Sequence, residues 1–225
     1  SPVHQLSERS FFLSRYDDVI AAYRDPRTSS DKQAEFTPKF GDSPLLEHHT
    51  TSLVFNDPPL HTRVRRLIMG ALNQRAIKQM ERGLIQLIDE LLNDIEDRNS
   101  VDMISDFAAR IPIEVIGNLL DVPRDERAPL RDWSLAILSA LEPVPKPQVL
   151  QTGNQAVIDF TDYLRTLVRD RRQSPGDPAV DVLTRLIQGE KDGEKLTESE
   201  LLHNCIFLLN AGHETTTNLI GNGLH

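Results

Sequence analysis

The chain has 225 residues, of which 39% are hydrophobic and 26% charged, and its formal net charge at pH 7 is −9. This composition predicts a folded globular protein with a sizeable core and excludes a disordered chain. The acidic excess argues against nucleic-acid binding, which needs positive charge to meet phosphates. We expect no membrane association, because no apolar run is long enough to span a bilayer and no signal pattern begins the chain. The one cysteine, Cys205, cannot form an internal disulfide, and this usage predicts a cytoplasmic location.

The N-terminal part is predicted to combine a little β-structure with a short helix. Residues 10–16 are expected to form a strand or a half-buried edge, and residues 17–25 a short helix. The segment 27–51 contains prolines, a glycine and few apolar residues, so it is predicted to be a loop that is either functional or disordered. Its neighbouring His48 and His49 could bind a metal, but an adjacent pair in a loop is more often solvated.

A basic helix is predicted over residues 57–72. Asp57 can cap its free amides, and Pro58 is tolerated at the first helical position. Apolar residues then recur at three-to-four spacing, as in a helix with one buried face. His61 and Arg65 are four residues apart, so both side chains project from the same side of this helix.

The middle of the chain is predicted to be mostly helical. Helices are expected over residues 80–95, 105–120, 125–141, 148–172 and 180–188. A brief strand is predicted over 101–103, an extended proline-rich connection over 142–147 and a charged turn over 189–195. The predicted fold class is therefore mainly α, with a small β element near the N-terminus.

The most apolar segment is a predicted helix that starts at about residue 198. Thr197 and Glu200 have the spacing of a capping box, and the apolar residues that follow are dense enough for a helix buried on most sides. The polar stretch 210–217 interrupts this pattern, and its glycine and three threonines cost on the order of 2–2.5 kcal/mol of helicity. A buried carboxylate at Glu214 would cost more. Such a departure inside a core helix is where a functional site is expected.

Two stretches resemble soluble, bacterial-type cytochrome P450 monooxygenases. NDPPLHTRVRRL at residues 56–67 resembles the C-helix signature of this family, and AGHETT at 211–216 resembles the oxygen-binding groove of its I helix. Their order and separation also match, as does SRYDDV at 14–19. The resemblance covers nearly the whole chain.

The resemblance implies an incomplete P450 fold over residues 1–225, as the N-terminal part of a single domain. The B helix would lie near 17–25, the C helix near 57–72, and the I helix would begin at about 198. The implied activity is that of a haem-thiolate monooxygenase, which hydroxylates an apolar organic substrate with O₂. The implied cofactor is b-type haem, and the implied partners are a small apolar substrate and a ferredoxin-type electron donor.

The resemblance assigns cofactor contacts to the basic helix. His61 and Arg65 would hold the haem propionates, whereas the alternative is a solvated basic helix face. Arg63 and Arg66 would form a basic patch for an acidic electron-transfer protein. Ordinary solvated charges are the alternative for these two arginines.

In the helix that begins near residue 198, the resemblance makes Thr215 and Glu214 the catalytic residues that deliver protons during oxygen activation. The Thr215 hydroxyl can also bond the carbonyl of Ala211, four residues back. Ala211 and Gly212 are small, so they would let the backbone approach a flat macrocycle. The alternative is a run of core threonines bonded to their own helix, which explains a glycine and an acid less well.

Phe207 and Asn210 would line the substrate pocket, with segment 27–51 and the connection near 138–150 as its walls. Core packing is an equally good explanation for Phe207. A zinc helix is not expected, because Thr217 stands where an HExxH motif needs its second histidine. No metal ligand is therefore predicted in this chain.

The haem ligand of the family is a cysteine thiolate in a glycine-rich loop late in the chain. Cys205 cannot be that ligand, because it stands ten residues before Thr215 on the distal-side helix. The chain therefore resembles roughly the first half of a P450, and we expect it to be inactive alone. The alternative function is a non-catalytic helical module for binding or assembly, derived from a P450.

Overall fold

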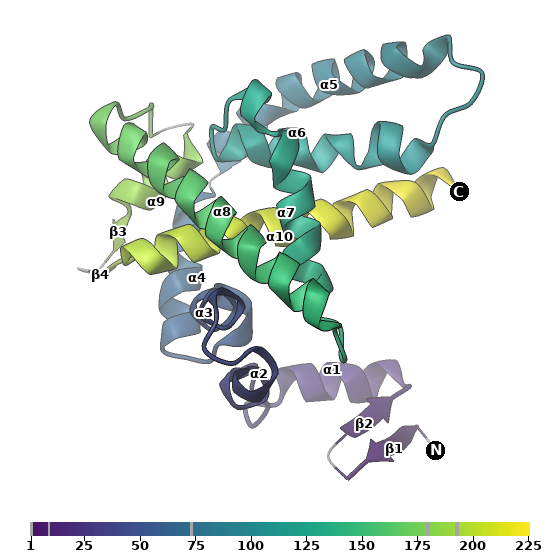
Figure 1. The fold of residues 1–225 in the computed structure, drawn as a ribbon, viewed down its shortest axis with the longest axis vertical. Helices are drawn as coiled ribbons and strands as arrows, with labels where there is room; N and C mark the ends of the chain where they lie inside the picture. The colour runs from purple at the N-terminus through teal and green to yellow at the C-terminus, as the bar shows by residue number, and fades with distance from the viewer. Residues whose placement is uncertain (1, 9, 73, 179–180, 192–193) are drawn as a thin grey trace.

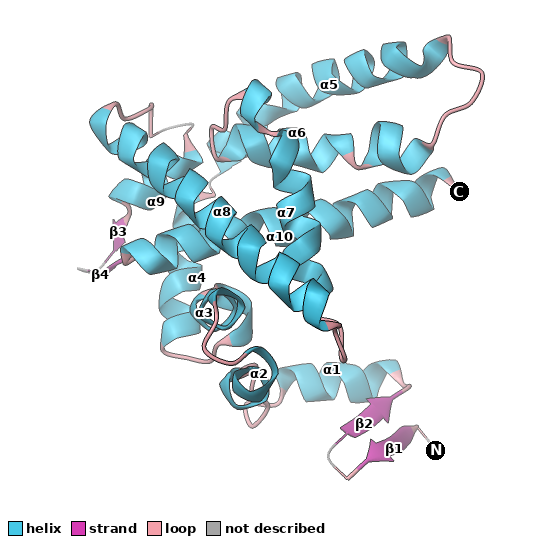
Figure 2. Ribbon diagram, viewed as in Figure 1, coloured by secondary structure: helices cyan, strands magenta, loops and turns pink. Residues whose placement is uncertain are grey.

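The computed structural model describes residues 2–8, 10–72, 74–178, 181–191 and 194–225, and helices account for most of them (Figures 1 and 2). The N-terminal part contains the antiparallel pair β1 (Val3–Ser7) and β2 (Ser10–Leu13), then α1 (Tyr16–Arg24), α2 (Gln33–Phe40), α3 (Pro44–Thr51) and α4 (Leu60–Ala71). The middle contains α5 (Gln74–Glu96), α6 (Arg110–Leu119), α7 (Ala128–Ser139), α8 (Pro147–Gln173) and α9 (Val182–Gln188). The short pair β3 (Glu190–Lys191) and β4 (Glu194–Lys195) precedes α10 (Glu198–Leu224). The mainly α prediction, with a small β element near the N-terminus, is confirmed.

The helix α10 is the element around which the others pack. It runs through the middle of the molecule, and α8 crosses it (Figure 1). The predicted capping box is present, since Thr197 Oγ1 accepts from the Glu200 amide at 3.2 Å and the Glu200 carboxylate accepts from the Thr197 amide at 2.9 Å. The helix continues unbroken through the polar stretch 210–217. Tertiary packing against α3, α6, α7 and α8 therefore offsets the poor intrinsic helicity of that stretch.

The main hydrophobic core lies where α7 and α8 pack against the first half of α10. Ile137 of α7, Phe160 of α8 and Ile206 of α10 have no exposed surface. The indole of Trp133 lies on Phe160, with ring centroids 5.2 Å apart. Burying a side chain of this size contributes about 1.5–3 kcal/mol, so this three-helix contact holds α10 in place.

The prediction that residues 27–51 form a loop is wrong, because α2 and α3 occupy most of this segment. Ser43 caps α3 by accepting from the Leu46 amide at 3.3 Å, and Pro44 takes the first helical position. Phe36 and Leu45 are buried in the main core. Few apolar residues suffice here because short helices are stabilised by tertiary packing more than by their own composition.

Two further local predictions are wrong, and an aspartate takes part in the observed structure of each. Residues 101–103 form no strand; instead, Asp102 accepts from the Ile104 amide at 2.9 Å and caps a turn of π-helix at Met103–Ala108. Asp57 does not cap α4, because its carboxylate accepts from the Ser29 hydroxyl at 2.6 Å and the Ser30 amide at 2.8 Å. An aspartate satisfies whichever amides the fold brings to it, and the sequence pattern alone does not identify them.

An ion pair joins α4 to the start of α10. The Arg63 guanidinium bonds the carboxylate of Glu200, whose side chain is only 9% exposed, and it also donates to the Lys195 carbonyl at 3.1 Å. Burial raises the pKa of Glu200, but hydrogen bonds from Arg63 and Thr197 outweigh it and leave the pKa below its ordinary value. The capping residue of α10 is thus also the anchor of the α4 helix.

We expect the substitution Arg63→Met to lower the free energy of unfolding by about 3–5 kcal/mol, because Glu200 would keep a buried charge without its cation. The matched control is Arg172→Met, which removes a pair to Glu198 in which both side chains are about half exposed. That change is expected to cost at most about 1 kcal/mol. Urea unfolding measures both, and equal losses would contradict the anchoring role of Arg63.

Candidate active site

The second half of α10 has one open side and one packed side. Ala211, Glu214 and Thr215 are exposed, whereas His213 and Thr217 are buried. The predicted burial of Glu214 is therefore wrong, and its carboxylate carries no desolvation penalty of that kind. The polar stretch therefore avoids the cost of burying a charge, because Glu214 lies on the open side of the helix.

A pocket of about 200 Å³ lies against this open side. Its apolar lining comes from Val54, Phe55, Leu138, Leu141, Phe207 and Ala211. Its polar lining comes from His48, His49, Ser52, Asn210, Glu214 and Thr215. The pocket thus brings together five of the predicted site residues on α10 with parts of both predicted walls.

The Thr215 hydroxyl donates to the Ala211 carbonyl at 2.7 Å, as the spacing predicts. Thr217 makes the same bond to the His213 carbonyl at 2.9 Å on the packed side of the helix. A hydroxyl that donates to its own helix keeps its acceptor lone pairs free. Thr215 can therefore accept a further hydrogen bond inside the pocket, while Thr217 is enclosed by the core.

Gly212 does not line this pocket. A Cβ built on it would stand 2.6 Å from Cδ1 of Ile116, so the missing side chain allows α6 to approach α10 closely. Gly212 does permit a close approach, but the element that approaches it in this structure is α6, through the core residue Ile116.

The two adjacent histidines are buried, so the interpretation of a solvated pair is wrong. His48 and His49 are 2% and 3% exposed. The His49 ring lies among the rings of Phe36, Phe40 and Phe55, with centroids 5.3–5.7 Å away. Burial lowers the pKa of His49 to about 4, with Lys39 and His203 adding to the effect. Nothing in the local sequence distinguishes this aromatic cluster from an exposed pair.

A third histidine, His203 of α10, continues the cluster. Its ring centroid is 5.5 Å from that of His48, and its Nε2 lies 3.4 Å from the carboxylate of Glu47. Burial lowers the pKa of His203 despite this carboxylate, and burial together with the two neighbouring imidazoles lowers that of His48 well below its usual range. All three rings are therefore neutral at pH 7.

The pocket wall near Leu141 is tied to α2. The ammonium of Lys39 donates to the carbonyls of Leu141 at 3.0 Å and Glu142 at 2.6 Å. Both carbonyls belong to the connection between α7 and α8. The bonds hold one predicted wall of the pocket against the segment that supplies the other.

The predicted cofactor residues His61 and Arg65 lie on α4, outside this pocket. His61 is half-buried and Arg65 is exposed. Among the described residues, neither side chain has a hydrogen-bond or ion-pair partner, and only the nearby carboxylate of Asp57 interacts electrostatically with His61. Arg63 and Arg66 differ, because they pair with Glu200 and Glu194. The predicted patch of Arg63 and Arg66 is therefore neutralised within the chain.

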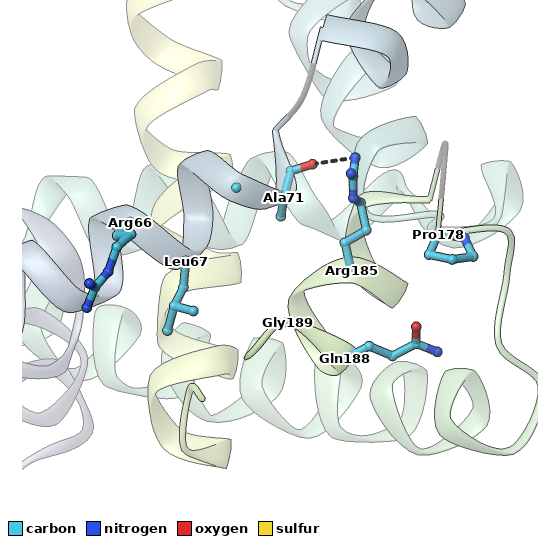
Figure 3. A pocket seen from close by; sticks show the side chains of 8 residues that line it. Arg66, Leu67, Ala71, Pro178, Arg185, Gln188 and Gly189 are labelled. Atoms are coloured by element: carbon cyan, nitrogen blue, oxygen red, sulfur yellow. Dashed lines mark hydrogen bonds between the residues drawn. The ribbon is translucent and has the colours of Figure 1, made fainter. Parts of the chain in front are cut away.

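A second pocket, of about 330 Å³, lies between α4 and α9 (Figure 3). Arg185 reaches across it and donates to the carbonyl of Ala71 at 3.3 Å, which satisfies the C-terminal end of α4 (Figure 3). Arg66 and Leu67 also line it. None of the residues predicted to contact the cofactor, dioxygen or the substrate lines this second pocket. We attribute the hollow to the packing of two helices.

The thiol of Cys205 is fully buried, and burial raises its pKa to about 12. Within the described ranges, no group of three or more His, Cys, Asp or Glu side chains is arranged to hold a metal ion. The Cys205 thiol is therefore protonated at pH 7 and buried in the hydrophobic core on one side of α10.

We expect an aromatic disulfide reagent to leave Cys205 unmodified in the folded chain and to modify it fully in urea. The reason is that only the thiolate attacks, and both burial and the raised pKa suppress it. Absorbance of the released thiol measures the rate. Fast modification in native buffer would show that the first half of α10 is open to solvent.

Comparison with known proteins agrees with this arrangement. Residues 130–225 match the family model described as "Cytochrome P450". Cytochrome P450 107B1 of Saccharopolyspora erythraea is 34% identical, over 95% of this chain and 52% of its own length. The chain belongs to the cytochrome P450 family. The cyclomarin C epoxidase CymV of Salinispora arenicola is 35% identical, over 98% of this chain and 55% of its own length.

The fold is likewise that of solved P450 structures. The structure of P450BioI, in complex with an acyl carrier protein that bears hexadec-9Z-enoic acid, superposes with a TM-score of 0.89 and 28% identity. It covers 99% of this chain, which covers 57% of that structure. The P450 chain thus spans about half the length of the relatives it matches. Across the described residues, no helix is both long and apolar enough to cross a membrane.

The cofactor of the P450 family is haem held by a cysteine thiolate. The described residues fit the side of haem away from the thiolate, because α10 presents a small exposed residue, Ala211, beside Thr215 and Glu214. His61 and Arg65, whose donors have no partner within the described part of the chain, fit carboxylate groups such as propionates. Cys205 does not fit the thiolate ligand, since its thiol is buried and protonated.

Proposed function

We propose that this chain builds the oxygen side and the substrate pocket of a haem-thiolate monooxygenase that inserts one oxygen atom from O₂ into an apolar organic substrate. The observation that carries the proposal is the pocket on α10, which places the hydroxyl of Thr215 and the carboxylate of Glu214 beside an apolar lining. Such a cavity can hold an apolar molecule beside groups that carry protons. The thiolate would come from outside these 225 residues.

Haem, when bound, supplies the activation of dioxygen. His61 and Arg65 would hold its propionates, because their donors project from one side of α4 about one turn apart. Ala211 would leave room for the flat ring by its small side chain. Gly212 is not included in this role, since Ile116 occupies the space beside it.

Thr215 and Glu214 would move protons. Glu214 is exposed, so its carboxylate can exchange protons with water, and it adjoins Thr215 in the chain. The Thr215 hydroxyl can accept a hydrogen bond from a water molecule on its free lone pairs and turn its own O–H from the Ala211 carbonyl, 2.7 Å away, toward an acceptor in the pocket. Losing this hydrogen bond costs little, because the Ala211 carbonyl still accepts a hydrogen bond from a backbone amide of the helix.

The proposed partners follow from the family and the pocket. The substrate is a small, mostly apolar organic compound, and the electron donor is a ferredoxin-type protein. We do not assign Arg63 and Arg66 to the surface on which this donor would dock, because Glu200 and Glu194 neutralise their charges. The buried, unpaired Cys205 agrees with a cytoplasmic enzyme.

Titration of the chain with haemin tests the cofactor assignment. We expect haemin binding, followed by absorbance and by quenching of Trp133 fluorescence, to weaken about tenfold in Arg65→Gln and in His61→Gln, because each loses one charge-assisted bond. The control is Arg169→Gln on the exposed side of α8. Unchanged affinity in both variants would contradict the propionate role.

The same samples separate the two candidate functions. A monodisperse monomer on size exclusion that ignores haemin supports the non-catalytic helical module instead. Reduction under CO should yield no thiolate-type Soret band from this chain alone, because Cys205 is enclosed. Such a band would contradict a thiolate from elsewhere.

A further inference from the structure

Three residues of the α10 pocket carry buried polar atoms without a partner. Asn210 Oδ1, His48 Nδ1 and His49 Nε2 have no hydrogen bond in the part of the chain that the structure describes. The three side chains are 7%, 2% and 3% exposed, and all of them line the pocket. An unpaired polar group in a desolvated place is unfavourable, so it is expected to find a partner when the pocket is filled.

These atoms lie close to the apolar part of the wall. Phe207 and Ala211 flank Asn210 on α10 at three-residue and one-residue spacing, and His49 packs among phenylalanines of α2 and the turn that follows α3. The pocket therefore has a polar spot on a surface that is otherwise suited to hydrocarbon. An apolar ligand without any polar group would leave that spot unsatisfied.

The charges at the pocket argue against an anionic ligand and offer a cation only Glu214. No lysine or arginine is among its lining residues, and its carboxylate, Glu214, repels an anion. His48 and His49 are held neutral by burial, so they supply no cation for a carboxylate ligand. A ligand ammonium could reach Glu214 and donate to the Asn210 oxygen, but it cannot satisfy an imidazole N–H, and burying it beside the histidines costs more than burying a hydroxyl.

A neutral imidazole donates at one nitrogen and accepts at the other, and a primary amide also does both. A hydroxyl group has the same dual capacity and satisfies such a spot whichever tautomer and amide orientation it meets. A carbonyl can only accept. The chemistry of the three side chains thus favours a hydroxyl.

We propose that the ligand of this pocket is an uncharged, mostly hydrocarbon molecule with a hydroxyl group that bonds Asn210 and the His48–His49 pair. The inference rests on the proposed function in one respect only, which is that this cavity is the substrate pocket. It makes Asn210 and His49 specificity-determining residues. The polar group of the substrate then fixes which carbon faces Thr215.

Isothermal titration of the chain with three probes on one skeleton tests the proposal. The probes are 4-tert-butylcyclohexanol, 4-tert-butylcyclohexanecarboxylate and 4-tert-butylcyclohexylammonium. We expect the alcohol to bind at least tenfold more tightly than either ion. Tighter binding of the carboxylate or the ammonium would overturn the proposal.

The substitution Asn210→Leu removes the amide but keeps the branched shape of the side chain, and we expect it to weaken alcohol binding about tenfold. Asn218→Leu is the matched control, because Asn218 lies on the same helix, is exposed and does not line the pocket. It should leave alcohol binding unchanged. Equal affinities of Asn210→Leu and the unmodified chain would overturn the role of Asn210.

A second variant, His49→Phe, keeps the test decisive if Asn210→Leu does not fold. Phenylalanine suits this place, because His49 already packs against Phe36, Phe40 and Phe55. We expect the variant to fold and to bind the alcohol several-fold more weakly. Haemin titration of the same samples separates the two proposals: haemin binding without alcohol preference overturns this inference alone, and alcohol preference without haemin binding overturns the proposed function alone.

Discussion

Replacing Thr215 by valine is expected to lower the rate of product formation about 100-fold in the haem-loaded enzyme that contains this chain. A positioned acid or base contributes about 10²–10⁴-fold to a step that needs protons. Valine has the shape of threonine without the hydroxyl, so it removes the only hydroxyl that α10 contributes to the described pocket lining. Glu214→Gln should slow the reaction in the same direction, because an amide cannot take up and release protons from water.

The control for this experiment is Thr217→Val. Thr217 makes the same bond to the carbonyl four residues back, but it lies on the packed side of α10. It is expected to change the rate by less than a factor of two and the fold hardly at all. Both the rate of product formation and the product formed per electron consumed are measured, because the ratio separates lost proton delivery from lost substrate binding. Equal losses at residues 215 and 217 would show that the hydroxyls act through helix structure alone.

Lowering the pH from 7 to 5 is expected to remove several kcal/mol from the free energy of unfolding. His48, His49 and His203 are neutral in the fold, and burial lowers the pKa of each below the unfolded value of about 6.5. Below pH 6.5 these histidines bind protons in the unfolded chain more readily than in the native chain. His48 and His49 then each cost about 1.4 kcal/mol per pH unit, or on the order of 2 kcal/mol each at pH 5, and His203 adds in the same direction.

The buried histidines lower the free energy of unfolding only as the pH falls below about 7. The contribution of these histidines to stability is constant above about pH 7, falls from pH 6.5 downward and levels off for His49 near its folded pKa of about 4. The charged groups facing the cluster are Lys39 and Arg165, which disfavour protonation, and Glu47, which favours it at His203. His213, buried near Arg131, adds in the same direction.

Urea unfolding followed by Trp133 fluorescence at pH 7 and pH 5 measures this loss. His49→Phe should remove about one histidine's share of the difference between the two pH values, and it should stabilise the chain at both. His4→Phe, on the exposed strand β1, is the control that leaves the difference unchanged. A difference that His49→Phe does not reduce would mean that this imidazole is protonated in the fold.

Several features of the site could be predicted from the sequence because they depend on neighbours within one helix. The Thr197–Glu200 capping box and the bond from Thr215 to Ala211 follow from contacts three and four residues apart. The common side of Phe207, Ala211 and Thr215 also follows from helix geometry, and these residues do line one pocket. Periodicity likewise placed the long helices, since their apolar stripes repeat over many turns.

Other features depended on residues far away in the chain. Glu214 is exposed and Gly212 is packed, although they are two residues apart, because α6 happens to approach one side of α10. Asp57 is bonded by Ser29 and Ser30 instead of its own helix. The burial of His48 and His49 required phenylalanines of α2 to surround them, and a segment poor in apolar residues gave no sign of this.

The sequence by itself determined the helical class, the polar stretch of α10 and the residue types that match the P450 family, because these are properties of adjacent residues and their spacing. Only the tertiary structure decided which side of α10 is open, that His48 and His49 lie in one pocket with Asn210, and that Arg63 pairs with Glu200. The physical reason is that burial, and with it the charge state and the hydrogen-bond partners of a side chain, is set by whichever distant elements pack against it.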